Sequence, residues 1–358
     1  MAIGPTYDAL KLPASVKTVL ITGAGGYVGQ ELTKLMLDLY PNVKLITTDI
    51  SAPPAFIHDT NRLKPIKADL GDAAQVQSLF EGENIGGVFA LHGIMSGGSE
   101  ANFELGWAVN VDSHVTLLKA THAHAKKQNS KPLYVFVSSL AVYGGPKCLP
   151  ESYVKPQDTP VVPQTSYGVQ KHIIELYAYD YGRKGYLDTR AVRLPTVAIR
   201  SGAPSSAASS FISGLIREPM QGQRSTCPIA SSPDDPILDN MPVFLSRTKT
   251  VVRNIAWAMC MPESNFKPED ARVVNIPGIK ITPRQILQAL AEHGGQEALK
   301  LVDYQKDQAV IDICSTWAGD YDTSGPEAMG FEVDDKQTGF ADAVGDFKEE
   351  LRAAGKLA

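Results

Sequence analysis

The sequence predicts an α/β fold, in which a doubly wound parallel sheet is joined to a smaller C-terminal lobe. Three features of the 358-residue chain support this prediction. Short apolar runs alternate with segments of helical apolar spacing, and the runs are continuous rather than alternating in polarity. Strands that crossover helices bury on both faces have this uninterrupted pattern. The alternation stops near residue 200, which predicts that a differently built lobe follows.

The strands and helices of the sheet are expected in strict alternation. Six strands are expected over residues 18–22, 43–50, 64–70, 86–93, 132–139 and 188–195. The intervening helices are expected over residues 27–40, 73–80, 102–125 and 167–182. In the first helix Val28, Leu32 and Leu35 share one face, as a helix packed on a sheet requires. Right-handed crossovers then place helices on both faces of the sheet.

The remainder of the chain lacks this regularity. Residues 201–242 are rich in Ser, Pro, Ala and Gly, with one expected helix over 207–217, and a further helix is expected over 249–261. Residues 277–350 alternate short helices and strands, and Trp317 is expected in their core. The expected boundaries are 16–200 with about 243–276 for the first domain, and 201–242 with 277–358 for the lobe.

The composition argues against several classes of protein. The net charge is −5, from 34 basic and 39 acidic residues, and no basic stretch predicts nucleic acid or an anionic membrane as a partner. No apolar run approaches the ~20 residues of a membrane span, and the first residues lack a signal-peptide run, so we expect a cytoplasmic protein. Cys148, Cys227, Cys260 and Cys314 lie far apart without histidines at ligand spacing. We expect reduced thiols and no metal site.

A glycine-rich turn, TGAGGYVG, follows the first expected strand directly. Gly23 would make the tight turn into the helix, Gly26 would let the backbone approach a pyrophosphate, and Gly29 would let the helix pack closely on the strand. The free N–H groups of the helix N-terminus would then face the phosphates. Strand, glycine turn and helix together predict a Rossmann-like domain that binds a dinucleotide, whereas an ordinary strand-to-helix turn is the alternative.

Asp49 lies at the end of the second expected strand. A carboxylate there can accept hydrogen bonds from both hydroxyls of the adenosine ribose, and it repels a 2′-phosphate. This position favours NAD over NADP as the cofactor. An exposed acid at a strand end is the alternative.

Three side chains form a candidate catalytic group. Ser139 ends the fifth expected strand, and Tyr167 and Lys171 lie four residues apart on one face of the next helix. An isolated tyrosine titrates near ~10, but a neighbouring ammonium and the positive nicotinamide ring stabilise the phenolate. We therefore expect Tyr167 to act as general base, Lys171 to hold the nicotinamide ribose and Ser139 to bind the substrate oxygen. A surface pair on a helix is the alternative for the tyrosine and lysine.

Taken together, these motifs resemble those of the extended short-chain dehydrogenase/reductase family, which includes sugar-nucleotide epimerases and dehydratases. The matching segments are TGAGGYVG, ADL, NVDSHVTLL, SSLAVYG, YGVQK and RLPTV, within about the first 200 residues. The resemblance implies NAD as cofactor, the second serine of SSLAVYG (Ser139) as catalytic, and a homodimer formed through a two-helix face.

The resemblance also implies which residues contact the cofactor. These are Gly23, Gly26, Tyr27, Val28, Asp49, Asp69, Leu70, Leu91, His92, Gly93, Asn110, Tyr167, Lys171 and Pro195. The Asp-Leu pair would flank the adenine, and Pro195 would begin a loop against the nicotinamide. The chain departs from the family at ALHG, where many members have HLAA, so His92 is expected as a wall residue, with a base as the alternative.

Three longer segments resemble the D-erythronate dehydrogenase group of that family: SGGSEANFELGWAVNVD, RLPTVAIRSGAP and AASSFISGLIREPMQG. The resemblance implies NAD-dependent oxidation of the C2 hydroxyl of a small sugar acid to the 2-oxo acid. Besides Ser139 and Tyr167, the candidate substrate ligands are Ser96, Gly97, Gly98, Ser209 and Ser210, with Arg200, Arg217 and Arg247 as candidates for the carboxylate. A solvated surface charge is the alternative for each arginine.

Three other functions remain open. A sugar-nucleotide epimerase would use the same three side chains but return the hydride, so it would need only catalytic NAD. A carbonyl reductase would act on another small molecule in the reducing direction. A redox-sensing or scaffold protein would bind the dinucleotide without catalysis, and such proteins usually lack the tyrosine or lysine.

Overall fold

The computed structural model describes residues 9–202, 207–267 and 270–356. Within them, the largest sheet has seven strands in the order β11-β7-β5-β4-β1-β2-β3, and every neighbouring pair is parallel. Its strands are β1 (Thr18–Thr22), β2 (Lys44–Asp49), β3 (Leu63–Lys67), β4 (Ile85–Ala90), β5 (Leu133–Ser139), β7 (Asp188–Leu194) and β11 (Val273–Asn275). The six expected strands are confirmed. The sequence analysis missed β11, because three residues are too few to show a periodic pattern.

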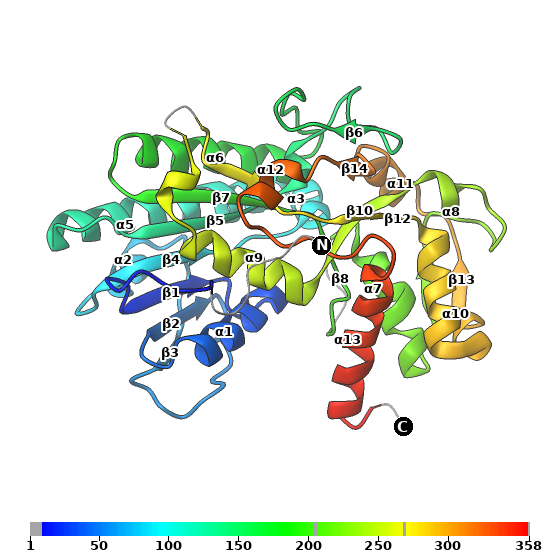
Figure 1. The fold of residues 1–358 in the computed structure, drawn as a ribbon, viewed down its shortest axis with the longest axis horizontal. Coiled ribbons are helices and arrows are strands. Elements are labelled where there is room, and N and C mark those ends of the chain that lie inside the picture. Colours follow the sequence, from blue (N-terminus) through cyan, green and yellow to red (C-terminus); the bar gives the residue numbers. More distant parts are fainter. Residues whose placement is uncertain (1–8, 203–206, 268–269, 357–358) are drawn as a thin grey trace.

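Helices cover both faces of this sheet (Figure 1). One face carries α1 (Tyr27–Leu39) and α9 (Thr248–Cys260), and a buried apolar cluster joins them to the strands. The other face carries α2 (Ala73–Ser78), α5 (Ser113–Gln128) and α6 (Ser166–Arg183), with a second cluster between helices and sheet. This is the doubly wound architecture that the continuous apolar strands predict.

The helix expected over residues 102–125 is interrupted. It consists of α4 (Phe103–Trp107), a π-helical turn (Ala108–Asp112) and α5. A π-helical turn takes in an extra residue and changes the direction of the side chains that follow, and such turns are frequent at functional sites. Here the turn contains Asn110, which the sequence analysis expects near the cofactor.

The lobe is built around a three-stranded sheet of β8 (Thr196–Ala198), β10 (Val243–Arg247) and β12 (Ile279–Ile281). A separate apolar cluster joins this sheet to the lobe helices. Those helices are α7 (Ser210–Arg217), α8 (Ile237–Asn240), α10 (Pro283–Leu299), α11 (Gln308–Cys314) and α13 (Gly339–Ala353). Strand β10 pairs within the lobe whereas α9 packs on the large sheet, so the chain crosses between the two bodies after Arg247.

The remaining elements are short. The two-stranded pairs are β9 (Ser225–Cys227) with β13 (Val302–Tyr304), and β6 (Tyr153–Val154) with β14 (Asp320–Tyr321). Short helices α3 (Ser96–Ala101) and α12 (Ser324–Ala328) complete the described elements, with a few 3₁₀ turns. All four cysteines are free thiols. No helix in the described part of the chain is both long and apolar enough to cross a membrane.

Candidate active site

A cavity of about 1090 Å³ opens at the carboxyl ends of the parallel strands. Five strands of the large sheet deliver a lining residue to it at or just after their ends: Gly23 after β1, Asp49 from β2, Leu91 after β4, Ser139 from β5 and Pro195 after β7. The lobe supplies the opposite wall. Ligands of open α/β sheets bind at this edge, so the fold itself brings the predicted residues together.

The glycine turn is shaped for close approach by a ligand backbone. Gly23 has φ +69°, and a Cβ on it would lie 2.6 Å from the amide nitrogen of His92. A Cβ on Gly29 would lie 2.2 Å from the carbonyl oxygen of Gly23, so only glycine lets α1 pack against the turn. Gly26 caps α1 without a side-chain hydrogen bond, which leaves the first N–H groups of the helix available to phosphate oxygens. These features fit the pyrophosphate of a dinucleotide.

The acid at the end of β2 is held in place by backbone donors. Asp49 accepts a hydrogen bond from the amide of Gly25 at 2.9 Å and one from the amide of Ile50 at 2.7 Å. Asp69 and Leu70 line the same end of the cavity, where the sequence analysis expects the adenine. Gly25 was not predicted as a site residue, although its place in the glycine turn is a visible signal.

Helix α6 brings Tyr167 and Lys171 to the end of β5. The Thr165 side chain caps the helix by accepting a hydrogen bond from the amide of Gly168 at 3.1 Å. A Cβ on Gly168 would lie 2.2 Å from the carbonyl oxygen of Ala141, just after β5. The glycine between the tyrosine and the lysine therefore lets the helix start approach the strand end that carries Ser139.

The two serines at the end of β5 have different partners. Ser138 donates a hydrogen bond to Oε1 of Glu175 at 2.5 Å, so its hydroxyl is committed to a buried carboxylate. Ser139 accepts a hydrogen bond from the amide of Ala141 at 3.1 Å and forms a hydrogen bond with Tyr167. The geometry therefore favours Ser139, the residue that the sequence analysis expects to bind the substrate oxygen.

The acidity of Tyr167 differs from the sequence-based expectation. Burial raises the pKa of this phenol to about 12, and the charge of Arg200 and the hydrogen bond from Ser139 only partly offset that rise. Arg200, and not Lys171, is the cation that lowers it, and the Lys171 ammonium donates to the carbonyl oxygen of Val137 at 3.0 Å. Without cofactor, desolvation of the phenolate thus outweighs the nearby cations.

Burial disfavours the charged form of Lys171. Only 2% of the residue is exposed, and its ammonium lies 5.0 Å from the centre of the Phe136 ring. Burial lowers the pKa of Lys171 to about 8, although the charge of Glu175 one helical turn away acts in the opposite direction. A desolvated cation lacking full compensation is a feature of functional sites.

A buried ion pair joins the catalytic helix α6 to the large sheet. Arg193 on β7 donates to both oxygens of Glu175, at 2.8 and 2.7 Å. Burial opposes ionisation of Glu175, but hydrogen bonds from Arg193, His172 and Ser138 keep the pKa of this carboxyl below its usual range. The ion pair thereby ties α6 to β7.

His92 is a neutral wall residue. Its Nδ1 lies 2.7 Å from the Thr22 hydroxyl and its Nε2 lies 2.9 Å from the Ser113 hydroxyl, and its ring stacks on His114 at 3.6 Å. Burial, aided by the charge of Lys171, lowers the pKa of His92 to about 3. Both ring nitrogens are engaged, which disfavours the alternative role as a base.

Asn110 supports the cavity from behind. It is not among the described lining residues. Its Oδ1 accepts from the amide of Ile94 at 2.9 Å, and its Nδ2 donates to Gln170 at 2.8 Å and Ser99 at 3.0 Å. The other predicted cofactor residues all line the cavity, so Asn110 positions the segment after Gly93 instead of contacting a ligand there.

The predicted substrate ligands are divided by the structure. Ser96 and Ser209 line the cavity, and the amide of Ala208 donates to the Ser96 hydroxyl at 3.4 Å. Gly97 and Gly98 belong to α3 rather than to a loop, and neither is among the described lining residues.

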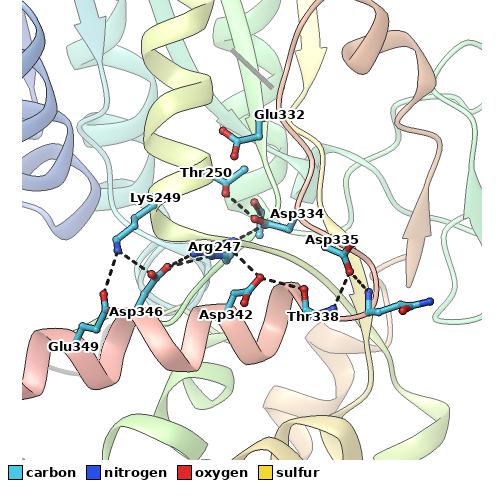
Figure 2. A network of polar contacts seen from close by, with 12 residues as sticks. Arg247, Lys249, Thr250, Glu332, Asp334, Asp335, Thr338, Asp342, Asp346 and Glu349 are labelled. Carbon is cyan, nitrogen blue, oxygen red and sulfur yellow. Dashed lines mark hydrogen bonds and ion pairs between the residues drawn. The ribbon is translucent and has the colours of Figure 1, made fainter. Parts of the chain in front are cut away.

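Two of the three candidate arginines lie away from the described cavity wall. Arg217 is buried and paired with Glu218. Arg247 donates to Asp346 of α13 at 2.8 Å and lies 3.6 Å from Asp342, within the polar network of Figure 2. Both guanidiniums fasten elements of the lobe to one another. The sequence does not reveal the distant partner of Arg247, and the neighbouring Glu218 is a visible signal that Arg217 is paired.

Arg200 is the arginine that reaches the cavity. It follows β8 and lines the cavity along with Tyr167 and Ser139. Its charge acts on both Tyr167 and Tyr27. The sequence analysis weighed it as a carboxylate ligand without distinguishing it from the other two arginines.

An aromatic wall was missed. Phe244 of β10, Trp317 and Tyr321 line the cavity from the lobe, and the Phe244 and Tyr321 rings lie 4.9 Å apart. Trp317 was expected in the lobe core, where it does pack partly, but it also faces the cavity. These residues follow the catalytic motifs by many positions, and no local pattern marks them.

Comparison with known proteins agrees with this geometry. The family model described as "NAD dependent epimerase/dehydratase family" matches residues 19–234, which is more than half of the chain. The chain belongs to this family. Together with relatives named dehydrogenases that match most of the chain, the family shows that the protein is an NAD-dependent oxidoreductase of the extended short-chain dehydrogenase type, with NAD as its cofactor.

Family members with assigned names resemble the chain along most of its length. A D-erythronate dehydrogenase of Cupriavidus necator is 36% identical over 325 residues, which cover 88% of this chain and 94% of that protein. A D-erythronate dehydrogenase of Haemophilus influenzae is 33% identical over 319 residues, covering 88% and 95%. Among solved structures, a nucleoside-diphosphate-sugar epimerase from Agrobacterium tumefaciens has a TM-score of 0.80 at 27% identity and covers 94% of both chains.

Proposed function

We propose that this family member oxidises the C2 hydroxyl of a small sugar acid, such as D-erythronate, to the 2-oxo acid with NAD. The proposal rests chiefly on one observation: Ser139, Tyr167 and Lys171 line the same cavity as the glycine turn and Asp49. The choice of substrate is supported by the likeness to proteins named D-erythronate dehydrogenase, which covers 88% of the chain.

The chain's own residues divide the work of the reaction. Ser139 holds the substrate hydroxyl by a hydrogen bond, and the phenolate of Tyr167 takes its proton. NAD, when bound at the glycine turn, would supply the acceptor for the hydride that leaves C2. The charge of Arg200 lowers the pKa of Tyr167 and so favours the phenolate. Lys171 lines the cavity and is placed to hold the nicotinamide ribose. The substrate loses one proton and one hydride, so the alcohol becomes a ketone.

The cavity has room for more than one ligand. A volume of about 1090 Å³ exceeds the roughly 300–1000 Å³ of ordinary ligand pockets, which fits a site that holds both a dinucleotide and a substrate. Phe244, Trp317 and Tyr321 line its lobe side.

The test is a screen for NADH formation. The purified protein is incubated with NAD and each of a set of four- to six-carbon aldonates and uronates, with NADP in parallel. We expect NADH to accumulate with one or more four-carbon acids, and Tyr167→Phe to abolish this while NAD affinity stays within about twofold, because the phenol oxygen serves the proton step. Unchanged turnover by Tyr167→Phe would remove the phenol from the mechanism.

The same screen separates the other functions. Conversion of a nucleotide sugar without accumulation of NADH would establish an epimerase. Activity only with a carbonyl compound and NADH would establish a reductase. Binding of NAD without turnover of any compound would favour a sensor or scaffold.

A further inference from the structure

We infer that Arg200 binds the carboxylate of the substrate and so places the reacting hydroxyl on Ser139 and Tyr167. This inference rests on the proposed function and adds the residue that selects acids over neutral polyols. Three observations support it. Arg200 lines the cavity, hydrogen bonds hold its main chain in place, and its guanidinium has no acidic partner among the described residues.

Arg200 is held on a fixed part of the lobe. Its amide donates to the Ser213 hydroxyl on α7 at 3.1 Å, and its carbonyl oxygen accepts from Nη1 of Arg217 at 3.1 Å. Arg217 is in turn buried and paired with Glu218. The role of Arg217 is therefore to fix the main chain from which Arg200 extends toward the cavity.

The guanidinium of Arg200 has no acidic partner among the described residues. Three other arginines, by contrast, each form an ion pair with an acidic residue: Arg193 with Glu175, Arg217 with Glu218 and Arg247 with Asp346. A largely desolvated cation without a counter-charge is costly, and an anionic ligand that enters the cavity removes that cost. Planar guanidinium groups bind carboxylates through two parallel hydrogen bonds.

Arg200 lines the same cavity as Tyr167 and Ser139. Its charge lowers the pKa of Tyr167, so the guanidinium acts on the phenol of the expected general base. An acid bound by Arg200 would therefore have its carboxylate close to the general base. The hydroxyl on the carbon next to the carboxylate is then the one that reaches Ser139 and Tyr167, which agrees with oxidation at C2.

The alternative ligand is the pyrophosphate of NAD, because Tyr27 on the phosphate turn also lies within range of the Arg200 charge. The two possibilities predict opposite effects of removing the guanidinium. Loss of a substrate ligand raises KM for the acid and spares NAD affinity. Loss of a pyrophosphate ligand weakens NAD binding.

The experiment compares Arg200→Met, Arg200→Lys and the control Arg224→Met, which removes an exposed guanidinium paired with Asp303 on the lobe surface. For each, kcat and KM are measured with D-erythronate and with its neutral amide, and NAD affinity is measured by titration of protein fluorescence. We expect Arg200→Met to lose roughly 100-fold in kcat/KM for the acid, with much less loss for the amide and with NAD affinity unchanged. Arg200→Lys should recover part of the loss, and Arg224→Met should match the parent.

The pH profile supplies a second readout. The positive charge of Arg200 lowers the pKa of Tyr167, so its removal raises that pKa. The alkaline rise of kcat/KM for the amide should move to higher pH in Arg200→Met. A structural role of Arg200 would not produce that shift.

The outcomes are distinguishable. A loss of NAD affinity in Arg200→Met, or equal losses with acid and amide, would overturn the assignment. If the parent enzyme oxidises no sugar acid, the proposed function fails. Calorimetric titration of the NAD complex with D-erythronate then still tests Arg200: carboxylate binding that Arg200→Met abolishes supports the assignment, and no binding to the parent overturns it.

Discussion

Replacement of Lys171 by methionine should stabilise the protein while abolishing its activity. The ammonium is buried, and its pKa falls from 10.5 to about 8. At about 1.4 kcal/mol per pKa unit, the folded state carries a penalty of about 3 kcal/mol near pH 7 for keeping this charge. Methionine has a similar length and removes the charge. It also removes the hydrogen bond to Val137, which is worth about 1 kcal/mol.

The expected net gain in the free energy of unfolding is therefore about 2 kcal/mol near pH 7. The gain should depend on pH with a defined sign. Between the folded pKa of about 8 and the unfolded value of 10.5, the unfolded chain holds a proton that the folded chain has released. Raising the pH through this window stabilises wild-type protein, so the advantage of Lys171→Met should fall by about 2 kcal/mol by pH of about 9.5.

The assay is urea unfolding of the cofactor-free proteins, followed by tryptophan fluorescence at the two pH values. Lys119→Met, at an exposed position of α5, is the matched control and should change the free energy of unfolding by less than about 0.5 kcal/mol. A variant less stable than the parent at both pH values, or a difference that does not change with pH, would show that burial does not destabilise the ammonium.

Two further substitutions test the cofactor end and the support of the catalytic helix. Asp49→Ser should lower kcat/KM with NAD by roughly 10- to 100-fold and raise the preference for NADP, because it removes a charged acceptor for the ribose hydroxyls; an unchanged NAD/NADP ratio in steady-state kinetics would contradict this role. Glu175→Gln leaves the buried Arg193 without its counter-charge and should lower the free energy of unfolding by about 3 kcal/mol near pH 7. If urea titration gave a decrease of less than about 1 kcal/mol in the free energy of unfolding, water would be compensating the charge of Arg193.

The sequence predicts the part of the site whose geometry is local. The glycine turn, Asp49 and the pair Tyr167 and Lys171 each depend on a short motif within one strand–helix unit. Parallel strands then align their carboxyl ends by topology, so the motifs meet in one cavity without further information. This is why the large sheet agrees with the structure and why nearly all of the predicted cofactor residues line the described cavity.

The substrate side depends on packing between distant segments, and there the sequence predicts less. Phe244, Trp317 and Tyr321 face the cavity only because the lobe folds back over the sheet edge. Arg247 pairs with Asp346, 99 residues further along the chain, and the sequence alone does not distinguish it from Arg200. The Tyr-x-x-x-Lys motif also does not predict the raised pKa of Tyr167, because the burial of its phenol depends on the whole fold. The homodimer remains a prediction.

The most direct test of the proposed chemistry is transfer of deuterium from D-erythronate labelled at C2. The account predicts that the label moves to C4 of the nicotinamide, that one NADH forms for each acid consumed, and that the carbon product is the 2-oxo acid. Label that stays on the carbohydrate, with no NADH released, would contradict it.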